Sequence, residues 1–255
     1  MKLHFRKLGS GQPLVILHGL FGSSDNWQSL AKEWAESFDV YLVDLRNHGH
    51  SPHSDEMNYK VMAEDLEELF EDENIKDAIL LGHSMGGKTA MQFAGKNEDK
   101  LDKLVIVDIA PKSYPVHHDQ ILKALTTADL SELKSRKDVD EHIAQYIDEL
   151  PIRQFLMKNL YWKEKGKLGW RINVPVLNRE IKAMSDKIEL SSISTPTLFI
   201  AGGASNYINE GDHELIESIF SDVSIVTFDK VGHWVHAAAP KRFHEELMKF
   251  ARFGG

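Results

Sequence analysis

The chain has 255 residues, of which 42% are hydrophobic and none is cysteine, and its formal net charge is −9. This length and hydrophobic content suit one large α/β domain or a domain with an insertion, and they argue against disorder. The lack of cysteine excludes disulfides, a thiol nucleophile and a thiolate metal site. The acidic balance argues against nucleic acid or an anionic membrane surface as the main partner, because both bind basic proteins. A small molecule is therefore the expected partner.

No segment of the sequence predicts export or membrane insertion. Residues 1–7 lack the apolar stretch of a secretory signal. No apolar run approaches the roughly 18 residues that span a bilayer. The cytoplasm is therefore the expected location, and the oligomeric state stays open.

Predicted strands and helices alternate along the first part of the chain. Strand patterns cover residues 2–8, 14–17, 40–44, 78–81 and 104–108, and helical periodicity covers residues 27–36, 62–71 and 88–96. Strands separated by helices of this length imply parallel crossovers. Nearly continuous apolar runs imply a sheet covered on both faces. The prediction is an α/β fold with a mostly parallel, doubly wound sheet.

The pattern changes after residue 111, where scattered charges and helical periodicity replace the strand signals. We interpret residues 112–190 as a helical insertion without a strong strand. Strand patterns then return at residues 197–201 and 224–228, with helices expected at residues 210–219 and 240–252. The predicted core therefore consists of residues 1–111 and 191–255, interrupted once by the insertion.

The motif Gly82-His83-Ser84-Met85-Gly86-Gly87 lies directly between a predicted strand and a predicted helix. A serine hydroxyl is a weak nucleophile, and a sharp strand-to-helix turn can expose it to a base and to an oxyanion hole. Gly82 and Gly86 suit such a nucleophile elbow, because a Cβ there would collide with the adjoining elements. An ordinary glycine-rich loop is the alternative, but the flanking strand and helix favour Ser84 as a nucleophile.

A serine nucleophile needs a base, and thirteen histidines are available. Chemistry on doubly wound sheets gathers at the carboxyl ends of strands, so the base should follow a strand. His233 lies in the loop between the strand at residues 224–228 and the last helix, which makes it the predicted base. His236 is the nearest rival, but its place just before that helix suits a surface or capping role. His83 should diverge from its neighbour Ser84 in a tight turn.

The acid of the expected triad is missing from its usual place. In most hydrolases of this kind the acid follows the strand after the insertion, but residues 202–206 contain none, and Ser205 occupies that position. Glu210 and Asp212 lie too far into the next helix. Asp108 closes the strand beside the nucleophile strand and is the predicted acid, which would orient the imidazole. A loop-capping role for Asp108, and a Ser–His dyad without an acid, remain the alternatives.

An oxyanion hole needs a second backbone N–H besides that of Met85. The glycine-rich turn at residues 18–22 follows a predicted strand and supplies it. Leu20 is the expected donor and Phe21 the alternate, whereas a plain strand-to-helix turn is the structural alternative. Phe21 and Trp234 are expected to contact substrate.

The segment from Asp44 to Ser51 invites a metal hypothesis, because histidines occur at positions 48, 50 and 53. A hydrolytic metal site needs rigid ligands from a helix or from several strand ends, together with carboxylates, and this is one flexible turn. A structural loop beside the site is therefore expected, with no metal.

Three basic side chains near the proposed mouth, Arg46, Lys88 and Lys112, are expected to be solvated, as such residues usually are. The aromatic residues of the insertion are expected to pack mainly in its own core. They are Phe155, Tyr161, Trp162 and Trp170.

Taken together, these motifs resemble the α/β-hydrolase superfamily, and within it the YbfF-type bacterial esterases. The matching segments are His-Gly-Leu-Phe-Gly at 18–22, Arg-Asn-His-Gly at 46–49, Gly-His-Ser-Met-Gly-Gly-Lys at 82–88, Asp-Ile-Ala-Pro at 108–111 and Trp-Arg-Ile-Asn-Val-Pro at 170–175. The resemblance implies a serine carboxylesterase with a helical cap, with Asp108 as the acid and without a metal or organic cofactor. It also implies short- to medium-chain esters as substrates, with acyl-CoA thioesters as a further candidate class.

Two other functions remain open at this point. A cofactor-free perhydrolase or a carbon–carbon bond hydrolase could use the same three residues with a different pocket. A non-catalytic ligand-binding receptor on a hydrolase scaffold is the alternative outside enzymes, although the complete set of catalytic residues argues against it. A haloalkane dehalogenase is disfavoured, because it needs a carboxylate at position 84.

Overall fold

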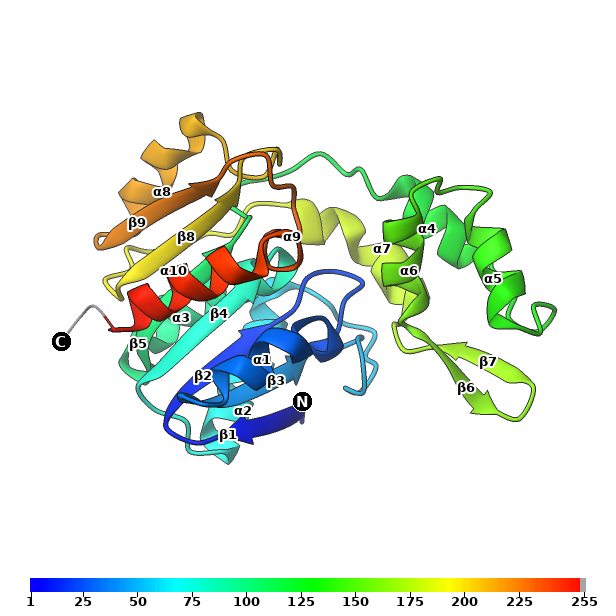
Figure 1. Cartoon of the computed structure of the whole chain (residues 1–255), viewed down its shortest axis with the longest axis horizontal. Helices are drawn as coiled ribbons and strands as arrows, with labels where there is room; N and C mark the ends of the chain where they lie inside the picture. Colours follow the sequence, from blue (N-terminus) through cyan, green and yellow to red (C-terminus); the bar gives the residue numbers. More distant parts are fainter. Residues whose placement is uncertain (253–255) are drawn as a thin grey trace.

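The computed structural model describes residues 1–252, and its core is a seven-stranded sheet in the order β1-β3-β2-β4-β5-β8-β9 (Figure 1). The strands are β1 (His4–Gly9), β2 (Gln12–Leu17), β3 (Phe38–Asp44), β4 (Ala78–His83), β5 (Leu101–Val107), β8 (Thr197–Gly202) and β9 (Val223–Phe228). Every neighbouring pair is parallel except β1 with β3. The predicted mostly parallel α/β sheet is confirmed. The last three residues of the predicted core, 253–255, lie outside the described residues.

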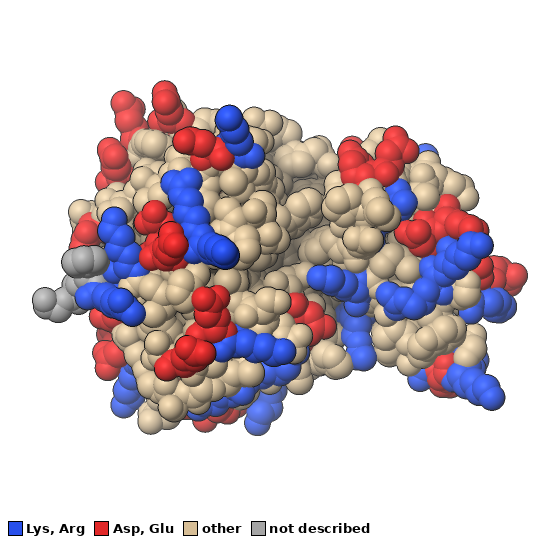
Figure 2. Space-filling model, viewed as in Figure 1, with Lys and Arg blue, Asp and Glu red and all other residues tan. Residues whose placement is uncertain are grey.

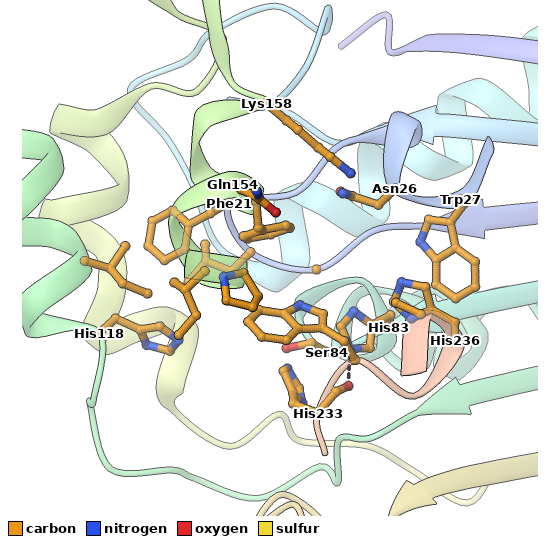
Figure 3. A pocket seen from close by; sticks show the side chains of 18 residues that line it. Phe21, Asn26, Trp27, His83, Ser84, His118, Gln154, Lys158, His233 and His236 are labelled. Carbon is orange, nitrogen blue, oxygen red and sulfur yellow. Dashed lines mark hydrogen bonds between the residues drawn. The ribbon is translucent and has the colours of Figure 1, made fainter. Parts of the chain in front are cut away.

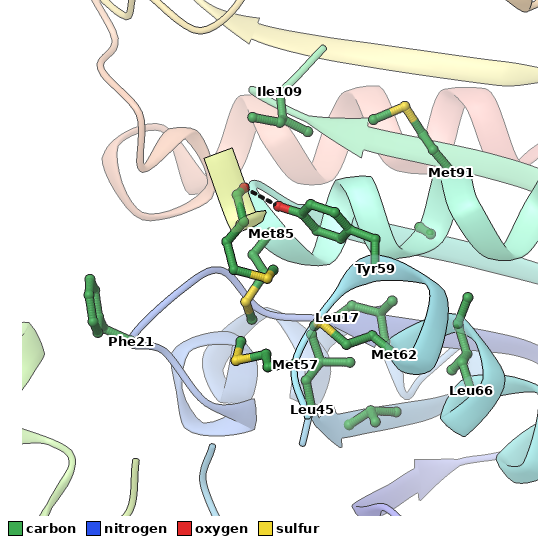
Figure 4. Close-up of a cluster of buried hydrophobic side chains, with 14 of the residues drawn as sticks. Leu17, Phe21, Leu45, Met57, Tyr59, Met62, Leu66, Met85, Met91 and Ile109 are labelled. Atoms are coloured by element: carbon green, nitrogen blue, oxygen red, sulfur yellow. Dashed lines mark hydrogen bonds between the residues drawn. The ribbon is translucent and has the colours of Figure 1, made fainter. Parts of the chain in front are cut away.

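Helices cover both faces of the sheet. They are α1 (Gln28–Trp34), α2 (Tyr59–Asp72), α3 (Met85–Asn97), α8 (His213–Ile219), α9 (Val235–Ala238) and α10 (Pro240–Arg252). Helices α1 and α10 pack on one face, whereas α2, α3 and α8 contribute to the hydrophobic cluster on the other. Met62 and Leu66 of α2 and Met91 of α3 lie in that second cluster (Figure 4). Coverage of both faces explains why the central strands have nearly continuous apolar sequences.

The insertion stands beside the carboxyl ends of the core strands (Figure 1). It contains the helices α4 (Asp119–Thr126), α5 (Arg136–Ile143), α6 (Leu150–Met157) and α7 (Val174–Ser185). We call residues 112–190 the cap and keep its boundaries as a prediction. Its helices bury apolar faces against one another through residues such as Leu122, Val139 and Leu156.

The expectation of an insertion without a strong strand is wrong. An antiparallel hairpin, β6 (Leu160–Glu164) and β7 (Lys167–Trp170), lies between α6 and α7. Gly166 adopts φ +78 in its turn, a conformation that favours glycine. The hairpin gave no strand signal because its outer residues are polar, and Trp162 is 50% exposed rather than packed in the cap core.

The structure also contains a four-residue helix, α9, which is too short to show a hydrophobic periodicity in the sequence. The other elements agree with the predicted ones to within a few residues at each end. Helix α1 is shorter than the predicted segment at both ends, since Trp27 belongs to a preceding 3₁₀ turn, Ser24–Trp27, and the helix ends at Trp34.

Helix α10 provides a test of the core. Phe243 is fully buried between Trp27 and Trp34, with ring centroids 5.8 and 6.1 Å away. Replacing Phe243 with alanine should lower the free energy of unfolding by about 3–5 kcal/mol, because it removes apolar contacts and leaves a cavity. Urea denaturation measures the change. Replacing the exposed Glu245 of the same helix with alanine should change the free energy of unfolding by less than about 0.5 kcal/mol. Equal effects of the two variants would contradict this packing.

Candidate active site

Ser84 lies at the turn between β4 and α3 with φ +54 and ψ −117, a conformation unfavourable for any residue with a Cβ. The two predicted glycines make the turn possible. A Cβ on Gly82 would lie 2.3 Å from the carbonyl oxygen of Gly86, and a Cβ on Gly86 would lie 2.6 Å from the carbonyl oxygens of Leu17 and His18. The backbone therefore forms the predicted elbow, with Ser84 at the N-terminus of α3, where the helix dipole favours negative charge.

The structure brings His233 and Asp108 together from different strand ends. His233 lies in the loop between β9 and α9, and its Nδ1 is 2.7 Å from Oδ2 of Asp108. Nδ1–H donates this bond, so Nε2 of the neutral ring is left as the acceptor that a serine base requires. Ser84 and His233 line the same pocket, as Figure 3 shows.

Asp108 is completely buried, and its carboxylate is held by the loop that lacks an acid of its own. The N–H of Gly202 donates to Oδ1 at 2.8 Å, and the Ser205 hydroxyl donates to Oδ2 at 2.5 Å. These bonds stabilise the charged carboxylate, and the same Oδ2 faces His233. This bond from Ser205 was not predicted, although the place of Ser205 in the vacated acid position is a signal for it in the sequence. Asp212 instead pairs with Lys112 at 2.6 Å.

The two rival histidines are buried, and neither replaces His233 as the partner of Asp108. Nε2–H of His83 donates to the carbonyl oxygen of His233 at 3.0 Å, and burial holds the pKa of His83 well below its usual value. The expectation of a surface or capping role for His236 is wrong. Its ring is buried and stacks on Trp27 with centroids 4.0 Å apart, and burial lowers its pKa to about 3.

The 18–22 turn lies against the nucleophile. A Cβ on Gly19 would lie 2.9 Å from Nδ1 of His83 and 3.3 Å from the Cβ of Ser84, so a larger residue here would crowd both side chains. The N–H of Phe21 donates to Nε2 of His48 at 3.3 Å, so it is already used. Within residues 1–252, the N–H groups of Leu20 and Met85 make no hydrogen bond to the protein. This geometry favours Leu20 over Phe21 as the second oxyanion donor.

Two buried histidines brace this turn. Nδ1–H of His48 donates to the carbonyl oxygen of Arg46, and burial lowers the pKa of His48 to about 3. Nδ1–H of His18 donates to the carbonyl oxygen of Gly19, while its Nε2 accepts from the N–H of Leu45. Each neutral ring therefore joins the turn at residues 18–22 to the loop after β3. In the described part of the chain, no three His, Asp or Glu side chains are arranged to hold a metal.

The basic residues near the mouth are not solvated as expected. Arg46 is buried and forms two bonds to Asp65, at 2.6 and 2.8 Å. Lys88 is also buried, and Lys112 is half-buried in its ion pair with Asp212. Figure 2 shows charged side chains of both signs over the outer surface, whereas the hollow between core and cap is largely uncharged.

Two cavities meet at Ser84. The larger has a volume of about 320 Å³ and is lined by both predicted substrate contacts, Phe21 and Trp234. Its cap side is lined by apolar residues such as Ile152 and also by Gln154 and Lys158 (Figure 3). Phe155 also lines it and packs against Trp234 with ring centroids 5.5 Å apart, so this cap aromatic faces the pocket. The smaller, about 40 Å³, lies on the Met85 side.

Comparison with known proteins identifies the class of this fold and site. Residues 12–132 match the family model described as the alpha/beta hydrolase fold. The chain belongs to the α/β-hydrolase family. It is 37% identical to the esterase YbfF of Escherichia coli (strain K12) over 242 residues, which cover 94% of this chain and 93% of that protein. It is also 37% identical to the sn-1-specific diacylglycerol lipase ABHD11 of Mus musculus, over 93% of this chain and 80% of that protein.

Solved structures agree with this assignment. A marine microorganism esterase superposes with a TM-score of 0.95 at 44% identity, over 98% of this chain and 99% of its own. An E-2-(acetamidomethylene)succinate hydrolase superposes with a TM-score of 0.79 at 20% identity, which supports the fold alone. The predicted α/β-hydrolase resemblance is confirmed, and the protein is a hydrolase of the esterase and lipase type. Of the helices in residues 1–252, none has both the length and the apolar character needed to cross a bilayer.

The acid assignment can be tested by substitution. Asp108→Asn should lower kcat by about 10³–10⁴-fold, because the amide no longer holds His233 in the right tautomer or stabilises its cation. Steady-state kinetics measure the loss. Asp212→Asn, which removes another acid that follows this loop, should leave kcat within about threefold of wild type. A nearly normal Asp108→Asn enzyme would overturn the assignment.

The buried neutral histidines predict a pH dependence of stability. His48 stays neutral in the fold down to about pH 3, whereas in the unfolded chain it binds a proton below about pH 6.5. The free energy of unfolding should therefore fall as the pH drops from about 6.5 to about 4.5, by up to about 1.4 kcal/mol per pH unit for this one residue.

His48→Asn should flatten this slope by that amount, as measured by urea denaturation across the same pH range. His53→Asn, at an exposed position, is the matched control and should keep the wild-type slope. An unchanged slope in His48→Asn would show that His48 is not held neutral by the fold.

Proposed function

We propose that the chain is a serine carboxylesterase that acts through an acyl-enzyme on Ser84. The observation that carries the proposal is the bond of 2.7 Å between His233 and the buried Asp108, at the edge of the pocket that Ser84 also lines. A base oriented by a buried carboxylate, beside a serine in a strained elbow, is the arrangement that nucleophilic acyl transfer requires.

The reaction follows from these positions. The Ser84 hydroxyl attacks the ester carbonyl while Nε2 of His233 takes its proton, and the imidazolium is stabilised by Asp108. The N–H groups of Leu20 and Met85 donate to the oxyanion of the tetrahedral intermediate. His233 then gives its proton to the leaving alcohol. Water, activated by the same histidine, releases the acid and restores the serine.

We assign the two halves of the ester to the two cavities. The leaving oxygen receives its proton from His233, so the alcohol group must lie on the His233 side, in the cavity of about 320 Å³. The acyl group then lies on the Met85 side, in the cavity of about 40 Å³. That space holds roughly three water-sized groups. The expected substrates are small-molecule esters with short acyl chains and larger alcohols, and short-chain acyl thioesters share this geometry.

A series of p-nitrophenyl esters tests the function and the acyl assignment together. We expect kcat/KM to be highest for acetate to butyrate and to fall by about tenfold or more at octanoate, because the small cavity cannot hold a longer chain without rearrangement. Ser84→Ala should lose nearly all turnover of every ester. Turnover that persists in Ser84→Ala would refute the acyl-enzyme.

A matched pair of variants separates the cavities. Met184 lines only the small cavity and Ile152 only the large one. Met184→Ala should move the preference toward longer acyl chains, whereas Ile152→Ala should leave the acyl preference unchanged. A shift caused by Ile152→Ala alone would reverse the assignment of the two cavities.

A further inference from the structure

Lys88 joins the helix that carries the nucleophile to both ends of the cap. It lies in the first turn of α3, four residues after Ser84, and is only 1% exposed. Its Nζ donates to the carbonyl oxygen of Lys112 at 2.8 Å and to that of Asp186 at 2.6 Å. We call residues 112–115 and 184–187, where the chain enters and leaves the cap, the cap roots. One buried amine therefore binds a carbonyl in each root.

The two cap roots are also bonded to each other. The N–H of Tyr114 donates to the carbonyl oxygen of Ser185, and the N–H of Lys187 donates to the hydroxyl of Ser113. The roots thus form a narrow double connection, and Lys88 attaches this connection to α3. Nothing in the catalytic steps uses the amine itself.

Two tyrosines enclose the Lys88 amine. Nζ lies 5.5 Å from the ring centroid of Tyr59 and 4.9 Å from that of Tyr114, distances at which a cation is attracted to the ring. The Tyr59 hydroxyl also donates to the carbonyl oxygen of Met184, which ties α2 to the second root (Figure 4). Burial lowers the pKa of Lys88 to about 8, against the opposing effect of the Asp186 carboxylate. The amine is thus still mainly charged at neutral pH.

The same roots reach the catalytic histidine. The Tyr114 hydroxyl accepts from the N–H of Ala110 and donates to the carbonyl oxygen of Tyr207, both at 2.7 Å. The ring of Tyr207 stacks on His233 with centroids 4.0 Å apart. A displacement of the roots would therefore act on the pocket mainly through the cap residues that line it, because His233 is also held by its own bond to Asp108.

We propose that Lys88 is a positioning residue that fastens both cap roots to the nucleophile helix and thereby sets the place of the cap over the larger cavity. Its kinetic consequence rests on the proposed esterase function, whereas its structural consequence does not. Loss of the amine should loosen the cap while the residues that carry out the chemistry stay in place. Binding of an alcohol group that contacts the cap should then weaken more than the chemical step.

The test compares Lys88→Met with wild type. Methionine keeps a long apolar stem but removes the donors and the charge. We expect amide hydrogen exchange in residues 112–119 and 181–190 to quicken by about tenfold, with no change in β4 and β5. For an acetate ester of a bulky alcohol we expect KM to rise about five- to tenfold while kcat stays within about threefold. Lys96→Met, at an exposed position of the same helix, should match wild type in both measurements.

Wild-type exchange and KM in Lys88→Met would overturn the proposal, as would faster exchange throughout the core, which would indicate a purely structural role. If Lys88→Met does not fold, Lys88→Gln, which keeps amide donors, takes its place. Lys88→Gln should quicken the exchange and raise KM by about threefold each. Wild-type values in both measurements would overturn the proposal. Exchange needs no turnover. A wild-type protein that hydrolyses no ester would therefore refute the esterase function and leave the exchange result to decide the role of Lys88.

Discussion

The hydrogen bond between Asp108 and His233 is the constraint on which the site depends. It joins the end of β5 to the loop after β9, although β8 lies between these two strands. The imidazole of His233 must therefore reach across the loop after β8. This loop has the small Ser205 at the usual position of the acid, and Gly202 and Ser205 donate the remaining hydrogen bonds to Asp108. The buried charge is tolerated because each oxygen has a partner.

Neutral histidines form the second level of this arrangement. Hydrogen bonds of His18 and His48 fix the turn that contains the N–H of Leu20, while His83 binds the backbone carbonyl of His233. Burial keeps each ring neutral, and in His18 and His48 one nitrogen donates while the other accepts. The cap adds a third level, since it closes the larger cavity and is fixed to the core through its two roots. The core thus carries Ser84, Asp108 and His233, and the cap, attached through its two roots, forms one side of the larger cavity.

The sequence was most informative where the structure is local. The elbow around Ser84 and the alternation of strands and helices depend on neighbouring residues, so pattern and glycine spacing predicted them. The places of Asp108 and His233 after strands predict that both belong to the site, and the structure brings them together, while their catalytic roles stay predictions. The buried positions of Lys88 and His236, the bond from Ser205 and the hairpin β6–β7 depend on segments distant in the chain. A local sequence pattern holds no information about contacts between distant segments, so these features could not be predicted from it.

The central claim is that the Asp108 carboxylate holds the Nδ1 proton of His233, and proton NMR of the histidine-labelled protein tests it most directly. We predict one strongly downfield Nδ1–H signal from His233, typical of an imidazole bonded to a buried carboxylate, that persists in Ser84→Ala and Asp212→Asn and is lost in Asp108→Asn. A His233 signal that Asp108→Asn leaves unchanged would contradict the account.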